Sequence, residues 1–324
     1  MSKLSIVITH YNEPYEVIEK LFTSISHQRM VPWDEVDIHV VEDGTTDVPE
    51  QLLAELPCAV FHHHPEHGGI SVARNYGFDN SEGEYVMFCD CDDMFLNALG
   101  IHLILTAANE LDKPDIINSA FIEETKGDAG ELRIVRHDND RTFVHGKAFR
   151  RAYLKKNFIH FDKELTVHED GYFMQLAFVQ TKKVKYIETP FYLWCWRDDS
   201  ICRKEEFVLK TYPELVKVRT ALAERLKDRN LMEEYRASVI STFVFGYYDF
   251  QKTAFNDTKY AEYIIPARKA VRKFWRKYKD VVKGATKREI ADAMYVARAS
   301  AYKGGLLYEG MTLTQFIRIL EEGE

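Results

Sequence analysis

The first part of the chain places short apolar runs between stretches in which apolar residues recur at helical spacing. The apolar runs have the length and the β-branched content of buried strands. They are residues 4–9, 36–41, 59–61 and 85–89. Residues 17–27 and 71–78 have the helical spacing. Strands that alternate with helices predict an α/β fold with a mainly parallel sheet and helices on both of its faces.

Beyond about Glu205 the pattern changes, because Gly and Pro become sparse and no run predicts a strand. Long segments with helical period follow one another there. They are residues 213–229, 232–251 and 260–278. We therefore predict two domains, an α/β domain over residues 1–204 and a helical carboxyl-terminal domain over residues 205–324.

Composition narrows the class of protein. Of the 324 residues, 46% are hydrophobic, and the net charge of −8 argues against a protein whose whole surface binds nucleic acid or anionic lipid. The five cysteines show no CxxC spacing, which disfavours a zinc knuckle or a disulfide framework. Without a signal-peptide layout or an apolar run near the ~20 residues of a membrane span, we expect a cytoplasmic protein, with peripheral attachment to the inner face of the membrane as an alternative.

The strand at residues 85–89 leads into three carboxylates within four positions, Asp90, Asp92 and Asp93. Crowded carboxylates repel one another unless a cation neutralises them. Oxygen ligands suit Mg²⁺ or Mn²⁺, which can also bridge the phosphates of a nucleotide. Taken alone, this motif fits a solvated acidic turn equally well.

Two further polar segments follow strands. Glu42-Asp43-Gly44 ends the second strand, and an acid there can accept a hydrogen bond from a base or a ribose hydroxyl. Gly68 and Gly69 permit close backbone approach before a helix, and Arg74 can reach a phosphate or a neighbouring acid. Ligands of parallel sheets bind beyond the carboxyl ends of the strands, where these residues are expected. Either segment could also be an ordinary turn.

The order of these motifs resembles that of the family 2 inverting glycosyltransferases of the GT-A fold. The matching segments are residues 5–13, 41–47, 69–77 and 90–93, and the resemblance covers roughly residues 4–203. It implies a Rossmann-like GT-A domain with a donor half over about 1–98 and an acceptor half over about 99–204. The helical remainder carries none of the family's motifs.

The resemblance also implies roles for single residues. A UDP-sugar would be bound by Thr9, Tyr11, Glu13, Asp43, His67, Arg74, Asp90 and Cys91. Mn²⁺ or Mg²⁺ would be held mainly by Asp92, with Asp93 and His168 as further candidates. His10, His67 and Glu42 depart from the residues common in the family, which leaves the base and the sugar open.

Residues 165–173 match the family's Glu-Asp motif at the start of a predicted helix. Inverting transfer needs a base that deprotonates the acceptor hydroxyl, and we predict that Asp170 is this base, supported by Glu169. A helix amino terminus favours the carboxylate form, while the neighbouring carboxylate opposes it. Capping of the helix is the structural alternative.

Residues 194–203 lie where the family places residues that close over the donor. Arg197 or Arg203 could neutralise the diphosphate, and Trp196 could stack on a sugar. Alternatively, these arginines are simply exposed to solvent and the tryptophan belongs to the core.

The function stays open between three readings, the first two of which differ in the acceptor. The oligomeric state is also open. The first is a hydroxyl of a saccharide or cell-envelope glycan, and the absence of the Gln-x-x-Arg-Trp sequence favours single transfers. The second is a polyanion, such as nucleic acid or teichoic acid, bound by basic residues among aromatic ones. Those residues are Arg272, Lys273, Arg276, Lys277 and Lys279, and they could equally bind an anionic membrane surface that carries a lipid-linked acceptor. The third is a nucleotide-sugar-binding module without catalysis.

Overall fold

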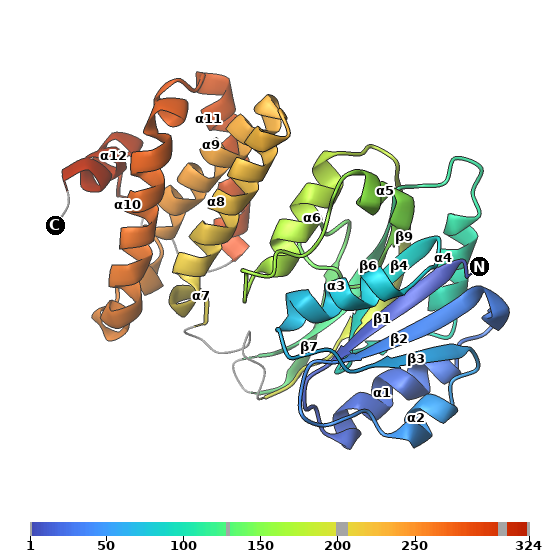
Figure 1. The fold of residues 1–324 in the computed structure, drawn as a ribbon. Helices are drawn as coiled ribbons and strands as arrows, with labels where there is room; N and C mark the ends of the chain where they lie inside the picture. Colours follow the sequence, from blue (N-terminus) through green and yellow to red (C-terminus); the bar gives the residue numbers. More distant parts are fainter. Residues whose placement is uncertain (1, 128–129, 199–206, 304–309, 323–324) are drawn as a thin grey trace. The chain divides into compact units, whose positions relative to one another are not determined.

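A computed structural model describes residues 2–127, 130–198, 207–303 and 310–322 (Figure 1). The chain divides into two compact units, Met1–Asp198 and Asp199–Glu324. The first unit contains every strand of the described residues, and the second contains only helices there. Within the described residues no helix combines the length and the apolar composition that crossing a bilayer requires.

The first unit is built on one nine-stranded sheet. The strands are β1 (Leu4–His10), β2 (Val36–Glu42), β3 (Ala59–His63), β4 (Tyr85–Asp90), β5 (Met94–Phe95), β6 (Ile116–Lys126), β7 (Leu132–His137), β8 (Lys147–Arg150) and β9 (Val184–Trp194). Their order is β3-β2-β1-β4-β8-β6-β9-β5, and β7 pairs with β6.

The first four strands are parallel, as predicted for the donor half. The rest of the sheet is mixed, because β8 is antiparallel to both β4 and β6 while β9 is parallel to β6. The prediction of a mainly parallel sheet therefore holds for the first half and not for the second. Every residue of β1 and β2 is buried, as expected for strands covered on both faces.

Helices lie on both faces of the parallel part, with α3 on one side and α1 and α2 on the other (Figure 1). The helices of this unit are α1 (Tyr15–Ser26), α2 (Glu50–Ala54), α3 (Ile70–Asn80), α4 (Gly100–Ala108), α5 (Arg151–Lys156) and α6 (Glu169–Val179). Helix α1 buries Ile18, Leu21, Phe22 and Ile25, the three-to-four spacing of one apolar face. This face packs in the main core with the side chains of β1 and β2.

The second unit is helical, as predicted. Its helices are α7 (Phe207–Lys210), α8 (Tyr212–Asp228), α9 (Met232–Asp249), α10 (Ala261–Lys283), α11 (Lys287–Lys303) and α12 (Leu313–Glu322). Aromatic rings form much of its core, and the Phe243 ring lies 5.2 Å from that of Trp275 and 5.5 Å from that of Phe316. Tyr212 donates a buried hydrogen bond of 2.7 Å to Asp249, joining α8 to α9.

Candidate active site

Polar residues gather at the carboxyl ends of β1, β2 and β4. The parallel register aligns Thr9 with Val41 on one side and with Asp90 on the other. Asp43 follows β2 directly and donates its backbone N–H to the His10 carbonyl at 2.9 Å. The pairing of three neighbouring strands therefore places the predicted donor-site residues at one edge of the sheet.

Arg74 on α3 is the centre of a carboxylate cluster. Its side chain is 3% exposed and donates to Asp90 at 2.7 Å, to Glu169 at 3.0 Å and to Asp170 at 2.5 Å. Burial lowers the pKa of Arg74, but the three carboxylates outweigh it and raise the pKa well above its usual range. Glu169, which is 95 positions from Arg74 in the chain, thus contacts the same permanent cation as Asp90.

The two predicted base residues share this guanidinium. Glu169 and Asp170 open α6, with side chains 13% and 15% exposed. Burial and the adjacent Asp170 raise the pKa of Glu169 to about 7, against the opposing effect of Arg74. Asp170 also accepts a backbone N–H from Val144 at 3.4 Å. The side chains of Glu169 and Asp170 are therefore held by tertiary contacts and not only by the helix end.

The loop after β4 gives its carboxylates different surroundings. Burial and Asp90 raise the pKa of Asp92 to about 6, although Arg197 donates to it at 3.0 Å and acts in the opposite direction. Asp93 is buried, where it accepts hydrogen bonds from the Tyr192 hydroxyl at 2.7 Å and the Cys195 N–H at 3.0 Å. The Asp92 side chain is thus partly exposed at 30%, whereas Asp93 is buried.

Asp90, Asp93 and His145 bring one potential metal-ligand atom each to within 4.8 Å of one another. The His145 Nδ1 atom is buried without a hydrogen-bond partner among the described residues. Burial lowers the pKa of His145, which favours the neutral imidazole. The donor set suits a divalent cation, but Asp93 already accepts two hydrogen bonds from the protein.

Asp43 is held from the turn before α3. Its side chain accepts backbone N–H groups from Gly68 at 2.9 Å and Gly69 at 3.2 Å. Gly69 has φ of 86°, a conformation that favours glycine. The exposed Tyr11 ring stacks on His67 with centroids 5.4 Å apart. These rings and the Asp43 carboxylate form one wall of the predicted nucleoside site.

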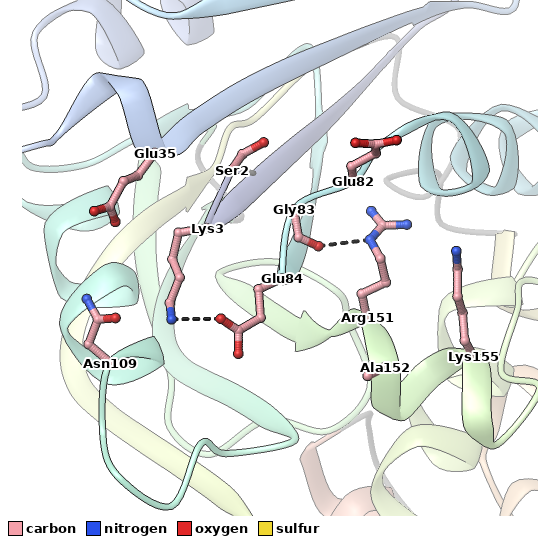
Figure 2. A pocket seen from close by; sticks show the side chains of 10 residues that line it. All are labelled: Ser2, Lys3, Glu35, Glu82, Gly83, Glu84, Asn109, Arg151, Ala152 and Lys155. Carbon is pink, nitrogen blue, oxygen red and sulfur yellow. Dashed lines mark hydrogen bonds and ion pairs between the residues drawn. The ribbon is translucent and has the colours of Figure 1, made fainter.

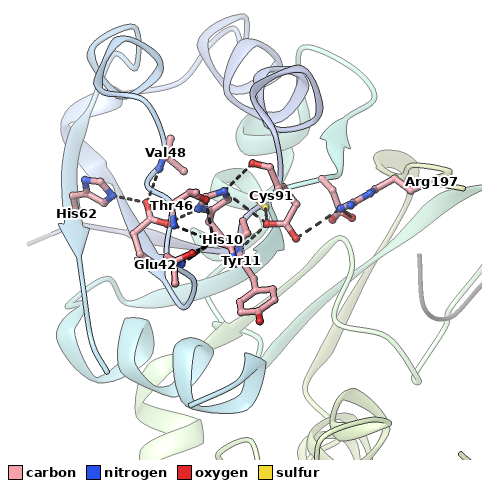
Figure 3. Close-up of polar contacts among 12 residues, drawn as sticks. His10, Tyr11, Glu42, Thr46, Val48, His62, Cys91 and Arg197 are labelled. Atoms are coloured by element: carbon pink, nitrogen blue, oxygen red, sulfur yellow. Dashed lines mark hydrogen bonds and ion pairs between the residues drawn. The ribbon is translucent and has the colours of Figure 1, made fainter. Parts of the chain in front are cut away.

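A buried histidine–glutamate pair lies close to Tyr11 (Figure 3). His10 and Glu42 are joined by a hydrogen bond of 2.5 Å, and His62 contacts the other Glu42 oxygen at 2.6 Å. Burial lowers the pKa of His10, but the hydrogen bond with Glu42 and the nearby carboxylates outweigh it and raise the net pKa. The Glu13 side chain accepts the Tyr11 N–H at 2.6 Å and the Cys91 thiol at 3.2 Å, linking β1 to the acidic loop.

The residues predicted to close over the donor are only partly described. The Trp196 indole donates to Asp198 at 2.9 Å, and Lys126 lies 5.4 Å from its ring centroid. Arg197 contacts the acidic loop, whereas Arg203 lies outside the described residues. His168 precedes α6 in the left-handed conformation with φ of 61°.

Two buried residues of this region, His145 and Lys147, had no role predicted from the sequence. Lys147 is fully buried, donates to the His145 carbonyl at 3.1 Å, and burial lowers the pKa of its amine to about 8. Both lie just before or within β8, whose antiparallel pairing brings it beside β4. In the sequence, their presence as polar residues in the segment from Val144 to Arg151 indicated that they could matter.

A hollow of about 650 Å³ lies at the opposite edge of the sheet (Figure 2). Its lining includes Lys3, Glu35 and Glu84, which directly precede β1, β2 and β4. Lys3 and Glu84 pair at 2.8 Å within it. Because this is the amino edge of the parallel strands, the hollow is separate from the carboxylate cluster.

The predicted basic residues lie on α10 of the second unit. Lys273, Arg276 and Lys279 are exposed, while Lys277 contacts Glu224 at 3.1 Å. Arg272 is half-buried and lines a hollow of about 280 Å³. Four of the five predicted cations thus face solvent.

Comparison with known proteins gives a consistent result for the first unit. Residues 5–162 match the model of Glycosyl transferase family 2. The chain is 24% identical over 271 residues to the poly(ribitol-phosphate) beta-N-acetylglucosaminyltransferase TarS of Staphylococcus aureus, a match covering 78% of this chain and 45% of TarS. It is 26% identical to the putative glycosyltransferase EpsH of Bacillus subtilis, covering 74% of each chain.

Among solved structures, S. aureus TarS 1–349 in complex with UDP-GlcNAc superimposes with a TM-score of 0.60 at 19% identity, over 96% of this chain and 94% of that one. At this identity the likeness establishes the fold, which is that of the GT-A glycosyltransferases. The family match spans most of the first unit and includes the four motifs that carry the resemblance. The first unit of the chain therefore belongs to glycosyl transferase family 2.

Proposed function

We propose that the chain is a metal-dependent, inverting glycosyltransferase that moves a sugar from a UDP-sugar to a hydroxyl of a cell-envelope glycan. The observation that carries the proposal is the meeting of Asp90, Glu169 and Asp170 at Arg74. It joins the predicted donor side of the site to the predicted base. The chain spans less than half of TarS, so activity, substrate and acceptor are all proposed here and not transferred from it.

The donor assignment is supported by the carboxyl edge of β1 and β2. Thr9 has a buried hydroxyl oxygen without a hydrogen-bond partner among the described residues, and Asp43 is oriented by two backbone N–H groups. Tyr11 and His67 offer stacked rings beside them. A flat base recognised at its polar edge fits such a wall. The TarS structure with UDP-GlcNAc supports UDP as the nucleotide.

The residues after β4 fit a divalent metal. Asp92 would hold it, because its side chain is 30% exposed and its raised pKa reflects burial and crowding by Asp90, which a cation would offset. Asp93 and His168 remain further candidates, and Asp90 would face the ribose or the metal. When bound, Mn²⁺ or Mg²⁺ would stabilise the negative charge that develops on the departing diphosphate.

Asp170 is proposed as the base that takes the proton of the acceptor hydroxyl. Its contact with Arg74 orients it, while Glu169 takes the other bond to the same nitrogen. As the hydroxyl loses that proton to Asp170, its oxygen would bond to the anomeric carbon on the face opposite the bond that breaks to the diphosphate, which inverts the configuration.

A polyanionic acceptor is the second candidate, favoured by the exposed cations of α10. TarS is named for a poly(ribitol-phosphate) acceptor, a chain of negatively charged phosphodiesters. Exposed Lys and Arg side chains track such charges without reading a sequence. Within a cell-envelope glycan, a polymer of alditol phosphates would satisfy both candidates.

The proposal is tested by calorimetric titration with UDP and UDP-sugars in Mn²⁺ and then in EDTA. The expected result is binding of one UDP-sugar that EDTA abolishes, followed by transfer with inversion seen in the anomeric proton coupling of the product. Absence of binding to any nucleotide by a folded sample would favour the non-catalytic module.

A further inference from the structure

Arg197 occupies a position beside the proposed metal ligand. Its Nη1 atom lies 3.0 Å from an Asp92 oxygen and 3.7 Å from a Glu13 oxygen. The Arg197 side chain is 20% exposed, so the contacts are partly shielded from water. Figure 3 shows Arg197 approaching this group from the side opposite His62 and Glu42. The guanidinium supplies positive charge beside Asp92, as Arg74 does beside Asp90.

The backbone before Arg197 is fixed by two other carboxylates. Asp93 accepts the Cys195 N–H at 3.0 Å, and Glu124 accepts the Trp196 N–H at 2.9 Å. Asp93 follows Asp92 directly, so one loop both anchors this segment and receives its arginine. Hydrogen bonds of the backbone before Arg197 and of its own side chain therefore both hold Arg197 near Asp92.

The charges around the loop divide between two arginines. Arg74 contacts Asp90 at 2.7 Å, and Arg197 contacts Asp92 and Glu13. A divalent cation on Asp92 would stand within a few ångströms of the Arg197 guanidinium, and two cations at that distance repel. Metal and guanidinium thus compete for one carboxylate. An arginine released from Asp92 would be well suited to a phosphate, which accepts two parallel hydrogen bonds from its fork.

We propose that Arg197 is the resident cation of Asp92, that the divalent metal displaces it, and that the released guanidinium then binds the diphosphate of the donor. This inference rests on the proposed function, because it takes the metal and the UDP-sugar as ligands. It gives one residue opposite effects on two ligands. Arg197 weakens binding of the metal alone and strengthens binding of the nucleotide in the presence of metal.

The test uses Arg197→Gln and Arg197→Lys in the full chain, with Arg133→Gln as the control. Arg133 is an exposed arginine on β7 that pairs with Glu131 in the same hairpin. Binding of Mn²⁺ alone is followed by the electron paramagnetic resonance of the free ion. Binding of UDP is measured by calorimetry at saturating Mn²⁺.

For Arg197→Gln we expect Mn²⁺ to bind about three- to tenfold more tightly, the range for removing a partly exposed competing ion pair. We expect UDP to bind about tenfold more weakly, since a charge-assisted contact is lost. Arg197→Lys should give smaller changes of the same signs, and Arg133→Gln should match the parent chain. Unchanged or weaker Mn²⁺ binding by Arg197→Gln, or unchanged UDP binding, overturns the exchange.

Asp92→Asn separates this inference from the proposed function. If Asp92→Asn abolishes Mn²⁺ binding while Arg197→Gln behaves as the parent chain, the metal site stands and the exchange is wrong. If neither the parent chain nor Arg197→Gln binds Mn²⁺, the metal site of the proposed function falls, and the exchange falls with it.

Discussion

At the scale of single residues, Glu169 and Asp170 form a matched pair for testing the base. Both contact the same Arg74 nitrogen, and their exposed fractions are nearly equal. We expect Asp170→Asn to lower the rate of transfer by about 10²- to 10⁴-fold, the usual contribution of a general base. Glu169→Gln should reduce it much less. Product formation with saturating donor measures both, and UDP binding should survive in each variant. Full turnover by Asp170→Asn would contradict the assignment.

The buried pair of His10 and Glu42 gives a pH dependence of stability. The pKa of His10 is raised above 6.5 and that of Glu42 is lowered below 4.5 in the folded chain. Because the pKa of His10 is raised, its charge stabilises the fold fully below about pH 6.5, and this contribution is lost as the pH rises through the folded pKa. Because the pKa of Glu42 is lowered, its charge stabilises the fold above about pH 4.5, and this contribution is lost as the pH falls through the folded pKa. The pair of His10 and Glu42 therefore stabilises the fold most at a pH between about 4.5 and about 6.5.

We expect His10→Gln to lower the free energy of unfolding by about 1–2 kcal/mol near pH 6, as when a buried hydrogen bond to a charged group is lost. The difference from the parent chain should shrink as the pH rises through the raised pKa of His10 in the folded chain. Thermal unfolding at several pH values measures this. A deficit that grows with rising pH would show that the charge of His10 does not stabilise the fold.

At the scale of elements, α3 packs closely on the sheet because it presents Gly77 to it. A β-carbon at Gly77 would lie 2.3 Å from Val7 and 3.1 Å from Val41, side chains of β1 and β2. Gly77→Ala should therefore destabilise the first unit by about 1–3 kcal/mol, as overpacking does. The matched control is Gly171→Ala in α6, where an added β-carbon meets no described atom within 4 Å. It should be neutral or stabilising by up to about 1 kcal/mol. Urea unfolding compares the two, and equal stabilities would show that α3 can move off the sheet.

The elements that could be predicted are those that a local pattern of apolar residues specifies. Strands β1 to β4 alternate with helices and have apolar runs, so local pattern was sufficient for them. Strand β6 instead pairs with the distant strands β8 and β9, with partners such as Asn118 and Lys147 or Ile116 and Val184, and no local pattern specifies such partners. The same limit applies to the site. The sequence indicates that Arg74 and Asp170 matter, but only the tertiary fold brings α3 and α6 together at one guanidinium.

At the scale of the whole chain, the two units carry different kinds of polar surface. The first gathers carboxylates and two arginines at one sheet edge, whereas α10 of the second presents Lys269, Lys273 and Arg276 to solvent. The spacing of four and then three residues places these cations on one helical face. Asp280 follows on the same face and limits the positive stripe to about two turns. A stripe of this length matches a short stretch of a phosphodiester polymer.

If this face binds a polyanionic acceptor, the combined change of Lys269, Lys273 and Arg276 to Gln should raise the KM for poly(ribitol phosphate) by about tenfold or more at low salt. The effect should fade at high salt, because contacts with phosphates depend on the release of counterions. Hydrolysis of the UDP-sugar without acceptor should be unchanged, since the donor residues lie in the first unit. Changing Lys210, Lys217 and Lys227 to Gln removes the same charge from α7 and α8 and serves as the control. KM values that rise equally in both triple variants would mean that net charge, and not the face of α10, governs acceptor binding. An unchanged KM in both would leave an uncharged glycan as the better acceptor, recognised within the first unit alone.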